Sequence, residues 1–561
     1  MKPEELQKLP PEVYKELEEV VGPENISEEP ALLDGYAWQP TFNSSPDLWV
    51  PRCAAAVLPG STEEVQAVVR ICNKHNILYK AHSTGWGTFN AVKAGGIVLD
   101  MRRMNRIVEI DEKNMYAVVE PYVSGISLQA ELLSRGLNCH MIGAGCGASL
   151  LASATSGVGD GWDGISMSYS PRNVLGVEWV LPDGELLQMG SLGSHGTWFS
   201  GDGPGPSLRG AMRGWCGAFG GLGVFTRVAV KIFNWPANGD HRSEGLMFDY
   251  LPPLPENLKV FMVVFRDRGS FAEGMYKIGE AEIGYIQCRN ALGMILGGAL
   301  PRFQRKLPGV PAMVEMLKSM QFCLTHIIAA NSPRELAYQE KALRAIALDS
   351  EAFVLDMGQL PLGGLLFWGL VKDSLPPLIF RIGGQFSSVF GHDETWDSSI
   401  LLNRVGQEIK QKWIDRDGMI DDLADNAWMF LQEDGMWTHC EELILYDPRE
   451  EKHVRSVNNA IAEAMISAVE HCQGPGFMLL NPMVRRMLSP MMSHYNFWTK
   501  KLKKEFDPLG LSDDVAYCSE EDVEEADIDL ENMTFDIPPE ELARIFEERI
   551  SVIPAPREMA Q

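Results

Sequence analysis

Four glycine-rich segments in the first half of the chain have residue types suited to binding a phosphorylated ligand. They read HSTGWGTFN at residues 82–90, GAGCGAS at 143–149, ASATSGVGDG at 152–161 and GGLGVFT at 220–226. Glycine allows backbone N–H groups to converge, so such a loop can hold a diphosphate with few basic side chains. A single loop of this kind is weak evidence for a phosphate site. Four of them, interleaved with strands, predict a long ligand lying against exposed backbone.

Asp160 stands near the end of the third segment, after Gly159, and is the leading candidate for a proton acceptor. A carboxylate partly withdrawn from water has a raised pKa and can act as a general base, although Asp160 could equally cap a turn or pair with a cation. Arg485 and Arg486 could bind a substrate carboxylate or stabilise negative charge, and the alternative for each is a surface ion pair. His494 and Tyr495 are secondary candidates for acid–base or orienting roles.

Several well-known sites are absent from the sequence. No G-x-G-x-x-G opens a helix after a first strand, and there is no Walker A lysine, G-x-S-x-G elbow or H-E-x-x-H. The run His439-Cys440-Glu441-Glu442 has metal-ligating residue types. Neighbouring positions on one element point apart, so the sequence favours a structural role for this run.

Composition sets limits on the partners of the chain. Its 561 residues carry a formal net charge of −27, which disfavours nucleic acid and anionic membrane surfaces as partners. The N-terminus lacks an apolar signal segment, and the longest apolar run, residues 358–371, is too short to cross a bilayer. The ten cysteines form no C-x-x-C pair. These features predict a cytoplasmic protein without membrane insertion.

The chemistry-bearing segments need elements to position them, and the sequence predicts short strands and helices around each. Ser61-Thr62-Glu63-Glu64 is a capping box that begins a helix with Val65 and Val68 on its buried face. The other predicted elements are strands at 77–79, 96–100, 116–120 and 223–233, a hairpin at 174–187, and helices at 127–135, 334–347, 454–471, 500–507 and 538–550. Residues 519–531 are strongly acidic and predict a solvated tail.

In their order along the chain, these segments resemble the vanillyl-alcohol-oxidase/p-cresol-methylhydroxylase (PCMH) superfamily of FAD-binding oxidoreductases. This superfamily includes flavoproteins similar to glycolate and D-lactate dehydrogenases. The matching stretches are LPGSTEEVQAVVR, STGWGTFNA, GGIVLDMRRMNRIVEID, YAVVEPYVSG, SLLASATSGVGDG, NVLGVEWVLPDGELL, GGLGVFTRVAVKIFNWP and LKKEFDPLGLSD. They cover most of residues 50–236 and 480–515, and they are specific as a set.

The resemblance implies an α+β fold, in which a two-lobed PCMH-type FAD-binding domain receives an inserted α+β substrate cap. Its N-terminal part would span residues 1–236, the cap 237–478, the returning segment 479–515 and the acidic tail 516–561. The resemblance also implies which residues contact FAD. They are His82, Ser83, Thr84, Gly85, Trp86 and Gly87 around the pyrophosphate, Gly147, Ser149, Leu150, Thr155, Gly157 and Gly159 along the isoalloxazine and ribityl chain, and Gly221, Gly223, Val224 and Thr226 at the adenine end.

Two substrate-binding features of the resembled family are missing from this sequence. Phenol-oxidising relatives grip the phenolate with tyrosines, but Trp86 and Asp160 stand at the matching places, so this clamp is missing. The lactate branch binds a divalent metal through G-D-G-N-x-H and E-H-G-[IV]-G, and neither occurs here. No metal is therefore expected.

The resemblance implies an FAD-dependent dehydrogenase or oxidase. It would transfer hydride from a small organic alcohol, hydroxy acid or benzylic C–H substrate to flavin N5, with oxygen, a quinone or a protein as electron acceptor. The alternative is a flavin-carrying electron-transfer subunit of a larger redox complex, suggested by the acidic tail and the missing substrate clamps. A same-fold NADPH-dependent reductase is less favoured because this chain is much longer. We expect a homo-oligomer.

Overall fold

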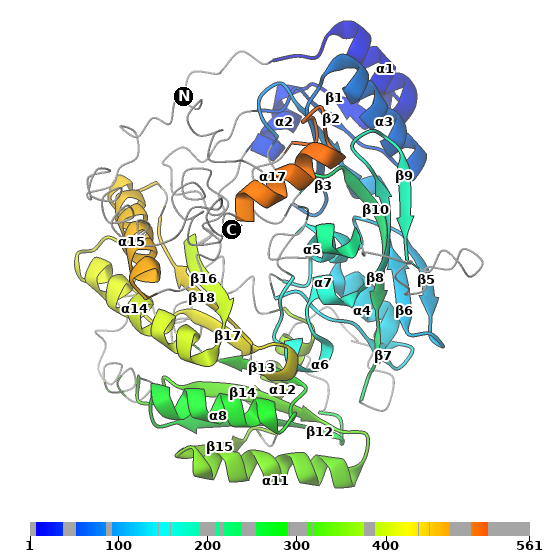
Figure 1. The fold of residues 1–561 in the computed structure, drawn as a ribbon. Coiled ribbons are helices and arrows are strands. Elements are labelled where there is room, and N and C mark those ends of the chain that lie inside the picture. The colour runs from blue at the N-terminus through cyan, green and yellow to red at the C-terminus, as the bar shows by residue number, and fades with distance from the viewer. Residues whose placement is uncertain are drawn as a thin grey trace, which may run out of the picture.

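Helices and strands are mixed along the whole computed structural model, as the sequence predicted (Figure 1). The structure describes residues 7–37, 52–85, 92–143, 145–156, 159–190, 208–212, 218, 220–236, 254–289, 291, 312, 315, 318–358, 360–374, 388–435, 437–447, 449–471 and 495–513. Within these ranges no helix is both long and apolar enough to cross a membrane.

The N-terminal part forms a four-stranded sheet of order β1-β2-β4-β3, in which β2, β4 and β3 run parallel. Its elements are α1 (Pro11–Val21), η1 (Pro23–Asn25), β1 (Ile26–Ser27), α2 (Pro30–Ala37), β2 (Ala55–Val57), α3 (Thr62–His75), β3 (Tyr79–His82), β4 (Ile97–Asp100) and η3 (Met101–Arg103). The predicted capping box is confirmed, because the Ser61 hydroxyl accepts the Glu64 N–H at 3.2 Å. The strand predicted at 77–79 begins later, so β3 carries His82 directly into the first glycine-rich loop.

A five-stranded antiparallel sheet of order β5-β6-β10-β8-β9 follows. Its strands and the elements around them are β5 (Ile107–Asp111), β6 (Tyr116–Val119), α4 (Gly125–Leu133), β7 (Leu137–Asn138), α5 (Leu150–Thr155), α6 (Gly164–Met167), α7 (Ser170–Asn173), β8 (Val174–Val180), β9 (Leu186–Met189), η4 (Leu208–Ala211), β10 (Val224–Lys231) and β11 (Phe233–Asn234). Leu128 and Leu132 of α4 share a buried core with Val177 and Trp179 of β8. This core holds the sheet under the second and third glycine-rich segments.

The middle of the chain contains two further antiparallel sheets, of order β13-β14-β12-β15 and β16-β18-β17. Their elements are β12 (Leu258–Phe265), α8 (Arg268–Glu280), β13 (Ile286–Arg289), β14 (Cys323–Ala329), α11 (Pro333–Asp349), β15 (Ala352–Asp356), α12 (Pro361–Val371), β16 (Ser388–Glu394), α14 (Trp396–Asp415), β17 (Ala427–Leu431), η7 (Glu433–Gly435), β18 (Thr438–Ile444) and α15 (Glu451–Glu470). Phe271 of α8, Trp396 of α14 and Val457 of α15 belong to one buried core. Phe261 of β12 and Met429 of β17 also belong to this core, so it joins the two sheets.

The last described segment returns to the N-terminal sheet. Helix α17 (Tyr495–Phe506) precedes this return, and the ring of its Phe506 stacks on that of Trp179 in β8 with centroids 5.5 Å apart. The Tyr79 N–H donates to the Leu511 carbonyl, and the Asp513 N–H donates to the Tyr79 carbonyl, each at 2.9 Å. The Lys503 ammonium also donates to the Gly221 carbonyl at 2.5 Å, next to the fourth glycine-rich segment.

Candidate active site

The third glycine-rich segment turns sharply at Gly159 and delivers Asp160 into the interior. Gly159 has φ +70°, and a Cβ placed there would lie 2.5 Å from the Ser170 Cβ, so only glycine fits. Its carbonyl accepts the Ser170 N–H at 2.9 Å. Asp160 is 5% exposed, and its Oδ1 accepts a hydrogen bond from Nε2 of Gln432 at 2.9 Å. A residue 272 positions away in sequence therefore orients the predicted base.

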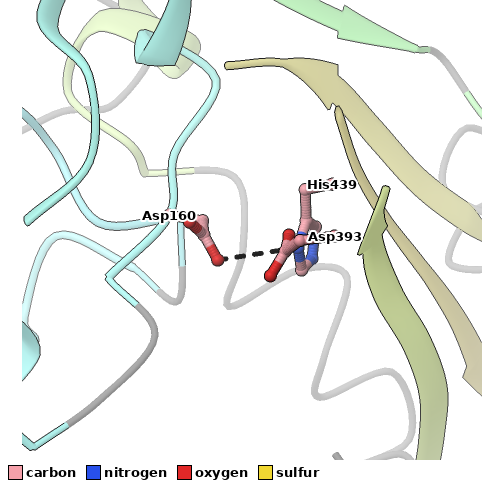
Figure 2. A group of neighbouring side chains, drawn as sticks. All are labelled: Asp160, Asp393 and His439. Atoms are coloured by element: carbon pink, nitrogen blue, oxygen red, sulfur yellow. Dashed lines mark hydrogen bonds and ion pairs between the residues drawn. The ribbon is translucent and has the colours of Figure 1, made fainter. Parts of the chain in front are cut away.

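Asp393 and His439 reach the same point from paired strands. They lie directly opposite one another on β16 and β18, and the His439 Nδ1 is 2.9 Å from the Asp393 Oδ1. The same nitrogen is 3.6 Å from the Asp160 Oδ2, and Figure 2 shows the three side chains converging. On its other side, His439 places Nε2 3.4 Å from the Glu441 Oε2.

Burial and charge shift the pKa values of this group in opposite directions. Burial, with the Asp393 carboxylate adding to it, raises the pKa of Asp160 well above its ordinary value. Burial alone would lower the pKa of His439, but its hydrogen bonds with Asp393 and Glu441 outweigh this effect and raise the pKa to about 10. The group can therefore hold a proton between a carboxyl and an imidazole, as acid–base chemistry requires.

A second buried ion pair fixes the turn that carries Asp160. Nδ1 of His140 is 2.6 Å from the Asp163 Oδ1, and Nε2 of His140 is 2.7 Å from the Gly159 carbonyl. The other Asp163 oxygen accepts the Met141 N–H at 2.8 Å. Burial lowers the pKa of His140, but Asp163 raises it more, so the imidazole is held protonated. His140 thus bridges Asp163 and the residue before Asp160.

We expect Asp163→Asn to lower stability because it removes one charge of a buried pair. Breaking such a pair costs about 3–5 kcal/mol. The matched control is Glu131→Gln, which opens the exposed 2.5 Å ion pair with Arg135 and should cost at most about 1 kcal/mol. Urea denaturation followed by circular dichroism measures both. Equal midpoints for the two variants would show that the His140–Asp163 pair does not hold the fold.

The first and second glycine-rich segments meet at a hydrogen bond. The Ser149 N–H donates to the Thr84 hydroxyl at 3.1 Å, although the residues are 65 positions apart. Ser149 also caps α5, since its hydroxyl accepts the Ala152 N–H at 3.1 Å. Leu150, the first residue of α5, is buried. The loop containing Ser83, Thr84 and Gly85 therefore lies against the start of α5.

These loops fit a cofactor with a diphosphate. Gly85 has φ +75°, which favours glycine, and no described atom lies within 4 Å of a Cβ placed on Gly147, so the backbone at Gly147 is open to a ligand. His82 stands next to Gly85, and its buried Nδ1 has no hydrogen-bond partner among the described residues. Burial lowers the pKa of His82, so the ring stays neutral and one of its nitrogens can accept a hydrogen bond.

The remaining predicted cofactor residues already have structural contacts. The hydroxyl of Thr155 donates to the Leu151 carbonyl at 2.8 Å, and the hydroxyl of Thr226 donates to Glu178 at 2.9 Å. The Gly223 N–H donates to the Ser512 hydroxyl at 2.8 Å. Val224 is buried at the start of β10, and Gly221 accepts Lys503. Roles for these residues in binding FAD stay predictions.

Several predicted site residues lie outside the described part of the chain. They are Trp86, Gly87, Gly157, Arg485, Arg486 and His494. Tyr495 is described, and it stands 60% exposed at the first residue of α17. Its predicted acid–base role stays a prediction.

Sequence reasoning missed Asp393, Gln432 and the facing arrangement of His439 and Glu441. Cys440 and Glu442 point to the other side of β18, where the Glu442 carboxylate accepts a hydrogen bond from Asn403 at 2.6 Å. Neighbouring residues of β18 do point to opposite faces, as predicted from the sequence. Residues two positions apart, such as His439 and Glu441, share one face. An alternation of His439 and Glu441 on a strand was the available signal.

Comparisons with known proteins find similarity to flavoproteins. A family model described as an FAD binding domain matches residues 53–190. The chain is 26% identical over 276 residues to the glycolate oxidase subunit GlcD of Bacillus subtilis, covering 48% of this chain and 51% of that protein. It is 29% identical over 233 residues to the flavoprotein subunit of 4-cresol dehydrogenase [hydroxylating] of Pseudomonas putida, covering 39% of each.

The alignments span about half, or less, of the length of these curated relatives. A crystal structure of p-cresol methylhydroxylase with substrate bound matches with a TM-score of 0.70 at 17% identity, covering 91% of this chain and 96% of that chain. At this identity the match concerns the fold, and it extends through the middle of the chain. Residues 53–190 are an FAD-binding domain, similar in sequence to those of these flavoproteins, and the fold of the chain is that of the p-cresol methylhydroxylase structure.

Proposed function

We propose that the protein is an FAD-dependent dehydrogenase or oxidase acting on a small organic alcohol, hydroxy acid or benzylic C–H substrate. The observation that carries the proposal is a buried acid–base group, Asp160 with His439 and Asp393, directly after Gly159 of the FAD-binding domain. FAD bound there would accept the hydride at N5. The named relatives include a glycolate oxidase subunit and a 4-cresol dehydrogenase subunit, which supports these substrate classes.

The residues of the chain would handle the proton. Asp160 would accept the proton of a substrate hydroxyl, since its raised pKa makes it a stronger acceptor than an ordinary carboxylate. Gln432 would keep the carboxylate oriented through its 2.9 Å hydrogen bond. His439 and Asp393 would stabilise the charge that changes beside them, and the burial of all three would exclude water.

The cofactor residues proposed are those of the first two loops, where the structural fit is clearest. Backbone around Ser83, Thr84 and Gly85 would hold the pyrophosphate, and Ser149 and Gly147 would line the neighbouring part of the cofactor. We also propose a cytoplasmic location. The described cysteines, seven in number, are all free, which supports a reducing compartment.

Flavin absorbance tests the proposal. We expect purified protein to show the visible absorbance band of oxidised flavin. Small alcohols, hydroxy acids and alkylphenols are then added without oxygen, and the expected result is bleaching of the band by one of these classes. Protein without a flavin band that recovers none on adding FAD would contradict the proposal.

The second candidate is a flavin-carrying electron-transfer subunit. It is supported by the net charge of −27, which could attract a basic redox partner. A stoichiometric partner that co-purifies, together with no bleaching of the isolated chain by any substrate, would favour this function. Rapid turnover of the isolated chain with oxygen or a dye would exclude it.

A further inference from the structure

Asp160, Asp393 and His439 have the arrangement of a metal ligand set. Each offers one ligand atom, and these atoms lie within 4.8 Å of one another. The side chains are 2–4% exposed and come from a loop of the FAD-binding domain and from two paired strands (Figure 2). Metal–ligand distances of about 2.0–2.2 Å place neighbouring ligands roughly 3 Å apart. The separations of the His439 Nδ1 from Asp393 and Asp160, 2.9 and 3.6 Å, are close to this spacing.

An unpartnered oxygen points into the cluster. The Oδ2 of Asp160 is buried and has no hydrogen-bond partner among the described residues, and its nearest cationic group is His439 at 3.6 Å. The Oε1 of Gln432 is likewise buried without a partner in the described part of the chain. A buried carboxylate oxygen without a partner costs free energy that a bound cation would remove.

Among the described residues, His439 is the cationic group within 4 Å of the Asp160 carboxylate. The same imidazole also lies 3.4 Å from the Glu441 carboxylate, so its one positive charge is shared between carboxylates. His140 is the next nearby cation, but Asp163 already pairs with it at 2.6 Å. Buried charge of one sign is stable only with a counter-charge or with protons on the carboxyls. A divalent cation supplies this counter-charge directly.

Glu441, Gln432 and Phe430 contact the three proposed ligands and hold their side chains in position. Glu441 stands 3.4 Å from the His439 Nε2, an arrangement that leaves Nδ1 free to ligate. Gln432 donates to Asp160 and Asp393 at 2.9 and 3.4 Å. The ring of Phe430 stacks on the His439 ring with centroids 5.0 Å apart, which holds the imidazole plane.

We propose that Asp160, Asp393 and His439 bind one divalent first-row cation of the Mn²⁺ or Zn²⁺ type. Two carboxylates suit Mn²⁺, and an imidazole nitrogen also suits Zn²⁺. These three residues are a different ligand set from the G-D-G-N-x-H and E-H-G-[IV]-G motifs, which do not occur in this sequence. For its role, the inference rests on the proposed function: the cation, held on the Asp160 Oδ2, would bind the substrate hydroxyl and lower its pKa, and the other oxygen of Asp160 would accept the hydroxyl proton.

The test is a titration of the FAD-loaded protein after treatment with a chelator. MnCl₂ and ZnCl₂ are added separately in a calorimeter, and free Mn²⁺ is followed by electron paramagnetic resonance. We expect one metal site per chain. The affinity of this site for the metal should fall at least about tenfold in Asp393→Asn and in His439→Gln. Asp373→Asn is the matched control, because Asp373 is also buried with an unpartnered Oδ1 but lies outside the ligand set. It should bind the metal as the wild type does.

Wild-type protein that binds neither cation stoichiometrically would overturn the inference. Binding that persists unchanged in both ligand variants would also overturn it, since the cation would then sit elsewhere. Absorbance of bound flavin reports whether each variant is folded. If one of the two ligand variants does not fold, Asp160→Asn, which lies on a separate segment, is titrated in its place. Bleaching of the flavin by substrate is measured independently, so failure of the metal site leaves the proposed oxidoreductase intact.

Discussion

Asp160→Asn should slow reduction of the flavin by substrate about 10²–10⁴-fold while leaving the bound flavin in place. The amide keeps the shape of the carboxyl and can still interact with Gln432, which now donates to Oδ1 at 2.9 Å. It can neither accept a proton nor carry the negative charge that lies 3.6 Å from the His439 Nδ1. Stopped-flow measurement of anaerobic flavin bleaching gives the rate directly.

Asp373→Asn serves as the control for this rate. Asp373 is fully buried, and burial raises the pKa of its carboxyl well above the ordinary value, as it does for Asp160. Its Oδ2 accepts the Gly145 N–H, so it tests the loss of a buried carboxyl outside the Asp160 group. A rate for Asp160→Asn close to that of the wild type would remove Asp160 from the chemistry. The search would then move to His494 and Tyr495.

Local signals predicted much of the FAD-binding half. The capping box at Ser61 and the turn at Gly184 appear where backbone chemistry requires them, and Gly184 has φ +82°. These features depend on a few neighbouring residues, so one sequence is enough to find them. Helix α4 ends at Leu133 with Ser134 as its C-cap, so Gly136, at φ +72°, lies one residue past the C′ position predicted for it. The helix expected at 127–135 begins earlier because Ser124, not a later residue, caps it.

The candidate site could be predicted only in part because its members meet through tertiary structure. Asp160 was found from its place after glycines, a local feature. Asp393 meets His439 only because β16 and β18 pair in one register, and Gln432 reaches Asp160 across 272 positions. A register shift of one residue would turn Asp393 away from the group. Nothing in the local sequence around Asp393 sets that register.

Gly85→Val should produce protein that purifies with little FAD. Gly85 has φ +75°, which a β-branched residue adopts at a cost of about 1–3 kcal/mol. Its Cβ would also lie 3.2 Å from the His82 Nε2, and its branches would fill the space over the loop. The strain lowers stability, whereas the added side chain keeps the pyrophosphate from approaching the backbone closely. The substitution therefore acts on cofactor binding, whereas Asp160→Asn acts on the chemical step.

Gly136→Val separates loss of the cofactor from simple backbone strain. Gly136 lies just past the end of α4 and has a nearly equal φ of +72°, and no described atom lies within 4 Å of its Cβ position. It should lose stability to a similar degree but keep its flavin, because it is not among the residues proposed to contact FAD. The ratio of flavin to protein absorbance after purification, and FAD affinity by fluorescence quenching, measure both variants. Equal FAD content in the two would mean that the loop after β3 does not hold the pyrophosphate, since only the position relative to the cofactor distinguishes these glycines.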